Sequence, residues 1–153
     1  MVGKQIFRQL GMLFVVASLF AGASVIAGQP YSFQMQLTVD GRVVSTPAAV
    51  VAIGTPGEVE VSTKDGHAYR VQIDPKHAVT TTGITPVTVS LRLLERESSR
   101  GAWKLIASPK MTGNPTNDKP LKLHWSHTPA DGVPLELDVR VVPGDRLASS
   151  GLN

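Results

Sequence analysis

Hydrophobic and polar residues alternate along much of the chain after residue 27, which is the period of a β-strand with one buried face. In the clearest run, Tyr31 to Val39, apolar side chains occupy the odd positions and polar side chains the even ones. Asp40-Gly41 follows directly and predicts a type I′ hairpin turn, because both central residues of that turn need a positive φ. The chain is then expected to return through residues 42–46.

Further short runs of the same kind follow, separated by turns rich in glycine and proline. No segment after residue 27 shows the 3.6-residue period of a helix. Seven to nine short strands with turns between them predict an all-β fold, a small antiparallel β-sandwich that covers residues 28–143. The small and polar residues 144–153 are expected to form a flexible C-terminal tail. The strands predicted after the first hairpin are Ala48–Ile53, Glu58–Ser62, Ala68–Ile73, Pro86–Leu94, Ala102–Ala107, Leu121–Trp125 and Leu135–Val142.

Two stretches of the chain share one order of features: a strand, a small residue shortly before a proline, Gly-x-Pro and another strand. The prolines are Pro47 and Pro56 in the first stretch, and Pro109 and Pro115 in the second. One interpretation is that a single β unit occurs twice, and that the two units pack face to face to bury their apolar sides. The other interpretation is coincidence in a proline-rich β chain, and the sequence leaves both open.

The N-terminal segment, residues 1–27, is predicted to be a helical secretory signal peptide. Lys4 and Arg8 precede an uncharged apolar stretch, and small residues allow cleavage after Ala23 or after Ala27. The alternative is an uncleaved anchor, in which case this segment alone would contact the membrane. We therefore expect the mature protein in the periplasm, or secreted.

The charge balance changes once the signal segment is set apart. The whole chain has 15 Lys and Arg residues against 12 Asp and Glu residues, and loss of Lys4 and Arg8 leaves 13 against 12. No cluster of basic residues interleaved with aromatic residues is present, so the sequence predicts no nucleic-acid partner. The chain has no cysteine, which excludes a disulfide framework and a lipid-modified N-terminal cysteine.

Motifs for catalysis are missing from the sequence. It contains no Gly-x-Ser-x-Gly elbow and no glycine-rich phosphate loop, so we expect a protein that is not an enzyme and needs no cofactor. Histidines are the remaining candidates, because imidazole binds Zn and Cu. His124 and His127 lie three residues apart, with His67 and His77 in other predicted loops. On a regular strand His124 and His127 would point to opposite faces, and only a turn beginning at Ser126 would bring them together.

Trp103 and Trp125 both fall in apolar register and are expected in the core, where aromatic side chains bury much area. The functional prediction is an exported, non-catalytic β-domain that acts as a binding or structural accessory of an envelope or secreted protein assembly. Its partner would be another envelope or secreted protein, bound at an open sheet edge or at a loop-rich end of the domain, with Pro47–Pro56 and Pro109–Pro120 as candidate edges. The alternative is a periplasmic metal-binding protein that uses His124 and His127. The oligomeric state is left open.

Overall fold

The computed structural model describes residues 28–64, 66–78, 81, 85–130 and 132–144, together with the backbone of Val15–Val16. The predicted signal helix and cleavage sites lie otherwise outside the described residues, as does the predicted tail after Gly144, so these stay predictions. The described residues form strands and turns and contain no helix. Accordingly, no helix in this part of the chain has the length and apolar character needed to cross a membrane.

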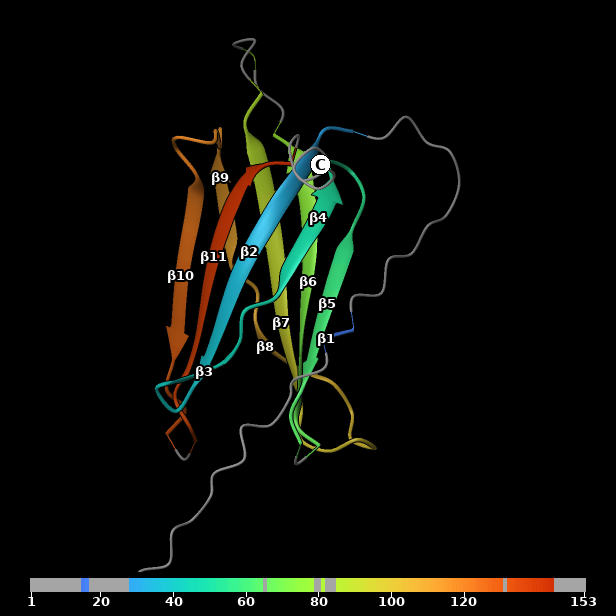
Figure 1. The fold of residues 1–153 in the computed structure, drawn as a ribbon, viewed down its shortest axis with the longest axis vertical. Coiled ribbons are helices and arrows are strands. Elements are labelled where there is room, and N and C mark those ends of the chain that lie inside the picture. Colours follow the sequence, from blue (N-terminus) through green and yellow to red (C-terminus); the bar gives the residue numbers. More distant parts are fainter. Residues whose placement is uncertain are drawn as a thin grey trace, which may run out of the picture.

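The described strands form two antiparallel sheets that face each other (Figure 1). Sheet A has the order β1-β5-β6-β7-β8, with β9 also paired to β7. Sheet B has the order β10-β11-β2-β3, with β4 also paired to β2. The predicted all-β fold of two antiparallel sheets is therefore confirmed. The strands are β1 (Val15–Val16), β2 (Pro30–Val39), β3 (Arg42–Ser45), β4 (Ala48–Ala52), β5 (Gly57–Ser62), β6 (Ala68–His77), β7 (Val87–Arg96), β8 (Lys104–Ala107), β9 (Lys110–Gly113), β10 (Leu121–His127) and β11 (Leu135–Pro143).

The alternation of the sequence becomes the core between the sheets. Along the four central strands β2, β6, β7 and β11, the odd-numbered apolar side chains, except Val39 and Pro143 at the strand ends, are buried in the core between the sheets. The first predicted turn is also confirmed, because Asp40 has φ 53° and Gly41 has φ 68°. Two described strands, β1 and β9, were not predicted. β9 is short, and only its methionine, Met111, is buried in the core.

The two halves of the chain pair their strands in the same way. In the first half, β2 pairs with β3 and β4, and the register shifts after Leu37. In the second half, β7 pairs with β8 and β9, and the register shifts after Leu93. At the same point in each half, the carbonyl of the proline that follows the short strand accepts a hydrogen bond from a backbone N–H of the long strand. These bonds run from Met35 N to Pro47 O and from Leu91 N to Pro109 O, each 2.9 Å long.

The remaining strands extend this correspondence. The hairpin β5–β6 pairs Val59 with Val71, and the hairpin β10–β11 pairs Trp125 with Leu137, so residue numbers differ by 66 in both strands. In each sheet the last strand of one half pairs with the first strand of the other half, since β6 pairs with β7 and β11 pairs with β2. Each half therefore contributes strands to both sheets. The expected arrangement, in which each unit forms one sheet and the two sheets pack together, differs from this interlocked one.

The strand register supports one of the two proline matches seen in the sequence and contradicts the other. Pro47 and Pro109 occupy equivalent positions, as the sequence comparison assumed. The Gly-x-Pro match does not hold, because the residue equivalent to Gly113 in β9 is Val51 in β4. Gly54 lies instead in the turn after β4 with φ 80°, a backbone conformation that favours glycine.

Candidate functional site

The two candidate metal ligands lie on opposite faces of β10, which is a regular strand over both residues. On the outer face of sheet B, His124 Nδ1 lies 2.7 Å from Asp138 Oδ1 on the neighbouring strand. On the other face, the His127 ring stacks on Trp125 with the ring centroids 6.0 Å apart. The turn at Ser126 that would bring both imidazoles together is not formed, because Ser126 pairs with Glu136 within the sheet.

The other histidines do not join them. His67 Nδ1 lies 3.8 Å from Glu95 Oε1 in sheet A, and His77 is exposed at the end of β6. Among the described residues, no three His, Cys, Asp or Glu side chains converge on one point that could hold a metal ion. The metal hypothesis stays a prediction, and the described geometry supplies no ligand set for it.

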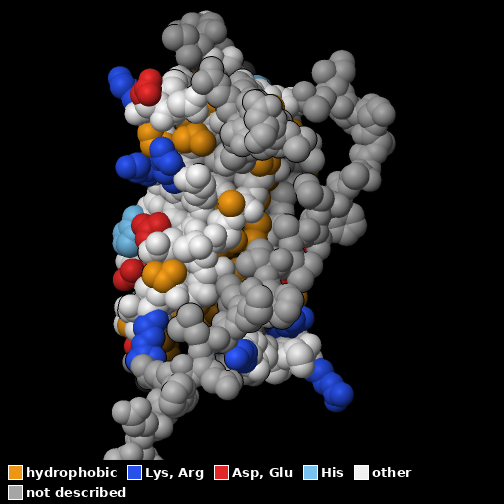
Figure 2. Space-filling model, viewed as in Figure 1, with side chains coloured by type: hydrophobic (Ala, Val, Ile, Leu, Met, Phe, Trp, Pro, Cys, Tyr) orange, Lys and Arg blue, Asp and Glu red, His pale blue; other side chains and the backbone are white. Residues whose placement is uncertain are grey.

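A shallow depression of about 380 Å³ lies on the outer face of sheet B beside the His124–Asp138 pair. Both side chains are well exposed, at 60% and 46% respectively, so water surrounds the pair. General acid–base chemistry in such a place lacks the exclusion of water that strengthens electrostatic interactions in active sites. In Figure 2, charged and histidine side chains gather along the side of the molecule where β10 lies. The polar side chains that line the depression are Gln34, Gln36, Thr46, Lys122, His124, Asp138 and Arg140.

Of the two tryptophans, only Trp125 packs against the core, where it is partly buried. The prediction is wrong for Trp103, which precedes β8 and lies among guanidinium groups. The Cζ atoms of Arg70 and Arg96 lie 4.1 and 4.6 Å from its ring centroid. The face of a tryptophan ring attracts cations through its quadrupole. Trp103 therefore packs against Arg70 and Arg96 and not against the core.

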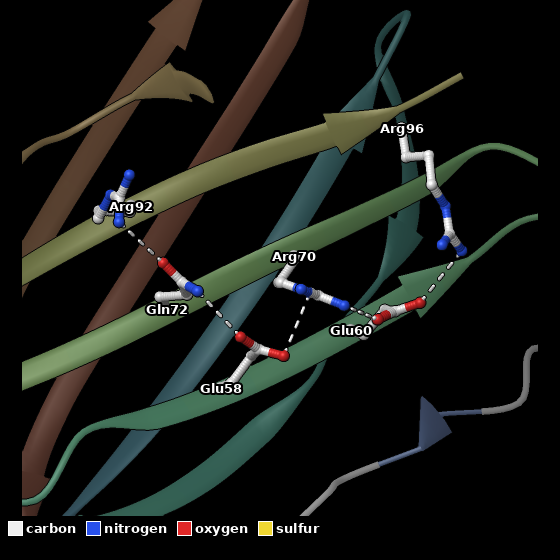
Figure 3. A network of polar contacts seen from close by, with 6 residues as sticks. All are labelled: Glu58, Glu60, Arg70, Gln72, Arg92 and Arg96. Carbon is white, nitrogen blue, oxygen red and sulfur yellow. Dashed lines mark hydrogen bonds and ion pairs between the residues drawn. The ribbon is translucent and has the colours of Figure 1, made fainter. Parts of the chain in front are cut away.

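The same arginines belong to a polar network across the outer face of sheet A (Figure 3). Glu60 on β5 accepts a 2.8 Å bond from Arg70 and lies 3.5 Å from Arg96. Glu58 lies 3.2 Å from Arg70 and accepts a 3.0 Å bond from Gln72. The acidic side chains of β5 are thereby held in fixed positions along the outer face of the sheet.

The candidate edges from the sequence, Pro47–Pro56 and Pro109–Pro120, contain β4 and β9. Both are edge strands, but each lies against the edge strand of the opposite sheet, with β4 beside β5 and β9 beside β10 (Figure 1). The remaining edges are the side of β5 (Gly57–Ser62) that faces away from β6 and the side of β10 (Leu121–His127) that faces away from β11. We call these sides the β5 edge and the β10 edge.

The β5 edge carries a feature that the sequence did not indicate. There the short strand β1 pairs antiparallel with β5, with Val15 opposite Val61 and Val16 opposite Glu60. The segment that adds a strand to sheet A therefore belongs to the predicted signal peptide. The β10 edge has no paired strand among the described residues.

No protein family, curated protein or solved structure matches the chain.

Proposed function

We propose that the chain is exported, loses its signal peptide, and acts as a non-catalytic β-domain that accepts a β-strand from another envelope or secreted protein at the β5 edge. One observation supports this most directly, which is the antiparallel pairing of Val15–Val16 with β5. In the precursor the edge is occupied by the signal segment. Cleavage after Ala23 or Ala27 would remove that strand and open the edge to a partner.

The chemistry of β5 favours strand addition. An unpaired edge presents backbone N–H and C=O groups, and a second strand satisfies them through main-chain hydrogen bonds. Proteins usually protect open edges with charged side chains, proline or a bulge. β5, with the sequence Gly-Glu-Val-Glu-Val-Ser, has no proline and an unbroken register with β6, and its two charges, on Glu58 and Glu60, are paired with Arg70.

The matching registers of the two halves support a second element of the proposal, namely that the sandwich consists of one β unit present twice. The unit would comprise β2 to β6 in the first half and β7 to β11 in the second. The longer second-half connections, between β7 and β8 and between β9 and β10, then represent insertions into a shared plan.

Strand acceptance can be tested with the signal segment itself as the probe. The full chain is expressed with its leader in a host that exports it, and mass spectrometry identifies the N-terminus of the purified product. A peptide of residues 11–20, with lysines added at both ends for solubility, is then titrated against this protein. We expect hydrogen exchange in residues 57–62 to slow on addition of the peptide, while exchange in β11 is unchanged.

A matched control peptide carries Val16→Pro, which removes one N–H and fixes φ, and should give no protection. If the purified protein retains residues 1–27, the signal-peptide element of the proposal is wrong. Equal exchange in residues 57–62 with and without the peptide would refute strand acceptance.

A further inference from the structure

The β10 edge carries a basic side chain, Lys122, on its outer face, whereas the outer face of the β5 edge carries the acidic side chains Glu58 and Glu60. The outer-face side chains of β10 include Lys122 and His124, and its inner-face row includes Leu121 and Leu123, which are only partly buried. Lys122 lies opposite Arg140 in the register with β11 and makes no ion pair with a described residue. A cation facing another cation across a pair of strands is unfavourable, so an acidic neighbour on its open side would stabilise it.

We infer that the strand added to the β5 edge is β10 of a second copy of this chain, so that copies associate head to tail. This inference rests on the proposed function, because it requires the β5 edge to accept a strand. It names the partner as the protein itself.

Charge and apolar contacts agree in one antiparallel register. When Glu60 of one copy is placed opposite Lys122 of the next, Glu58 comes to lie opposite His124 on the same outer face. Opposite charges in cross-strand pairs are stabilising. On the inner face the same register places the two valines of β5, Val59 and Val61, opposite Leu123 and Leu121, because side chains alternate between faces.

The two symmetric alternatives fit less well. If β5 paired with β5 of a second copy, the register centred on Glu60 would place Glu60 opposite itself, and a shift of two residues in the pairing would place it opposite Glu58. Like charges directly opposite are destabilising. If β10 paired with itself, Lys122 would gain no acidic neighbour. Pairing of β5 with β10 uses two different surfaces, so the copy at each end of an assembly retains one free edge and the association can continue.

The test uses the exported and processed protein over a range of concentrations in sedimentation velocity. We expect species larger than the monomer that grow with concentration. Lys122→Glu should lower the apparent association constant roughly tenfold, because it replaces an attraction with a repulsion. Lys122→Arg keeps the charge and should assemble as the original protein does.

The decisive measurement mixes two variants. Glu60→Lys and Lys122→Glu should each assemble poorly alone, whereas an equal mixture should assemble well, since every contact between unlike variants joins opposite charges. Glu60→Lys also removes contacts to Arg70 and Arg96, so its circular dichroism and unfolding curve are recorded first. If it does not fold, the comparison of Lys122→Glu with Lys122→Arg decides.

Four outcomes overturn the inference: a monomer at all concentrations, assembly that Lys122→Glu leaves unchanged, equal weakening by Lys122→Arg, or folded single variants that mixing does not restore. Protection of β5 by the signal-segment peptide separates the two proposals. A monomeric protein whose β5 is still protected by the peptide refutes self-association and leaves strand acceptance standing. Absence of both effects refutes strand acceptance as well.

Discussion

The β5 and β10 edges occupy equivalent positions in the two halves of the chain, yet their inner faces differ in burial. On β5, Val59 and Val61 are 1% and 2% exposed. Their equivalents on β10 are Trp125, which is partly buried, and His127, which is exposed. The sandwich has one corner where β4 lies beside β5 and an equivalent corner where β9 lies beside β10. The inner face of the edge strand is covered at the first, which we call the closed corner, and partly exposed at the second, the open corner.

The two corners also differ in which strand carries a glycine. At the first corner, Val51 of β4 reaches over Gly57 of β5, and a Cβ on that glycine would lie 2.6 Å from Val51 Cγ2. At the second corner the glycine is on the other strand, since Gly113 of β9 lies beside Leu121 of β10. The equivalent positions Val51 and Gly113 therefore place a large side chain at the first corner and none at the second.

The largest expected effect tests whether the halves are equivalent in their cores. Leu37 and Leu93 occupy matching positions at the register shift, and both are buried. We expect Leu37→Ala and Leu93→Ala each to lower the free energy of unfolding by about 2–5 kcal/mol, through lost burial and a residual cavity. Urea unfolding measures both. A loss below about 1 kcal/mol at one site alone would break the equivalence of the two halves.

A smaller effect is expected at the corners themselves. Gly57→Ala introduces a Cβ against Val51 and should cost about 1–3 kcal/mol through overpacking. Addition of Val51→Ala should relieve part of that cost, which a double-mutant cycle would show as a coupling energy. The matched change Gly113→Ala meets only Leu121 Cδ1, at 2.9 Å, the end of a partly exposed side chain that can move. Equal costs at residues 57 and 113 would contradict the closed and open corners.

Much of this fold could be predicted from the sequence because period-two alternation is a local signal. The strands β2, β5, β6, β7, β10 and β11 lie close to the predicted ranges, and the Asp40-Gly41 turn follows from its local need for positive φ. The short strand β9 was missed because it offers one buried apolar residue, Met111, which is too little for a pattern.

The arrangement at the edges could not be predicted, because it depends on contacts between distant residues. Trp103 has the apolar register of a core residue, but Arg70 and Arg96 on other strands determine its place. The pairing of Val15–Val16 with β5 joins segments far apart in sequence. For His124 and His127 the sequence left two arrangements open, opposite faces of a regular strand or one cluster at a turn beginning at Ser126, and the structure shows the regular strand.

The smallest expected effect compares the outer faces of the two edges. Glu60→Gln removes an acid that contacts Arg70 and Arg96, and should cost about 0.2–1 kcal/mol, the usual range for exposed ion pairs. Lys122→Gln removes a cation that lies opposite Arg140, so stability should stay equal or rise by up to about 0.5 kcal/mol. The measurement is urea unfolding of dilute protein at low salt.

Salt provides the control for this last comparison. At about 1 M salt the Debye length is about 3 Å, so both differences should shrink toward zero if they arise from charge. If Glu60→Gln and Lys122→Gln both lower stability at low salt, or both raise it, the charges of the two edges do not differ as described, with Glu60 paired to arginines on β5 and Lys122 facing Arg140 on β10. Differences that persist at high salt would show that packing of the two side chains, rather than their charge, distinguishes the edges.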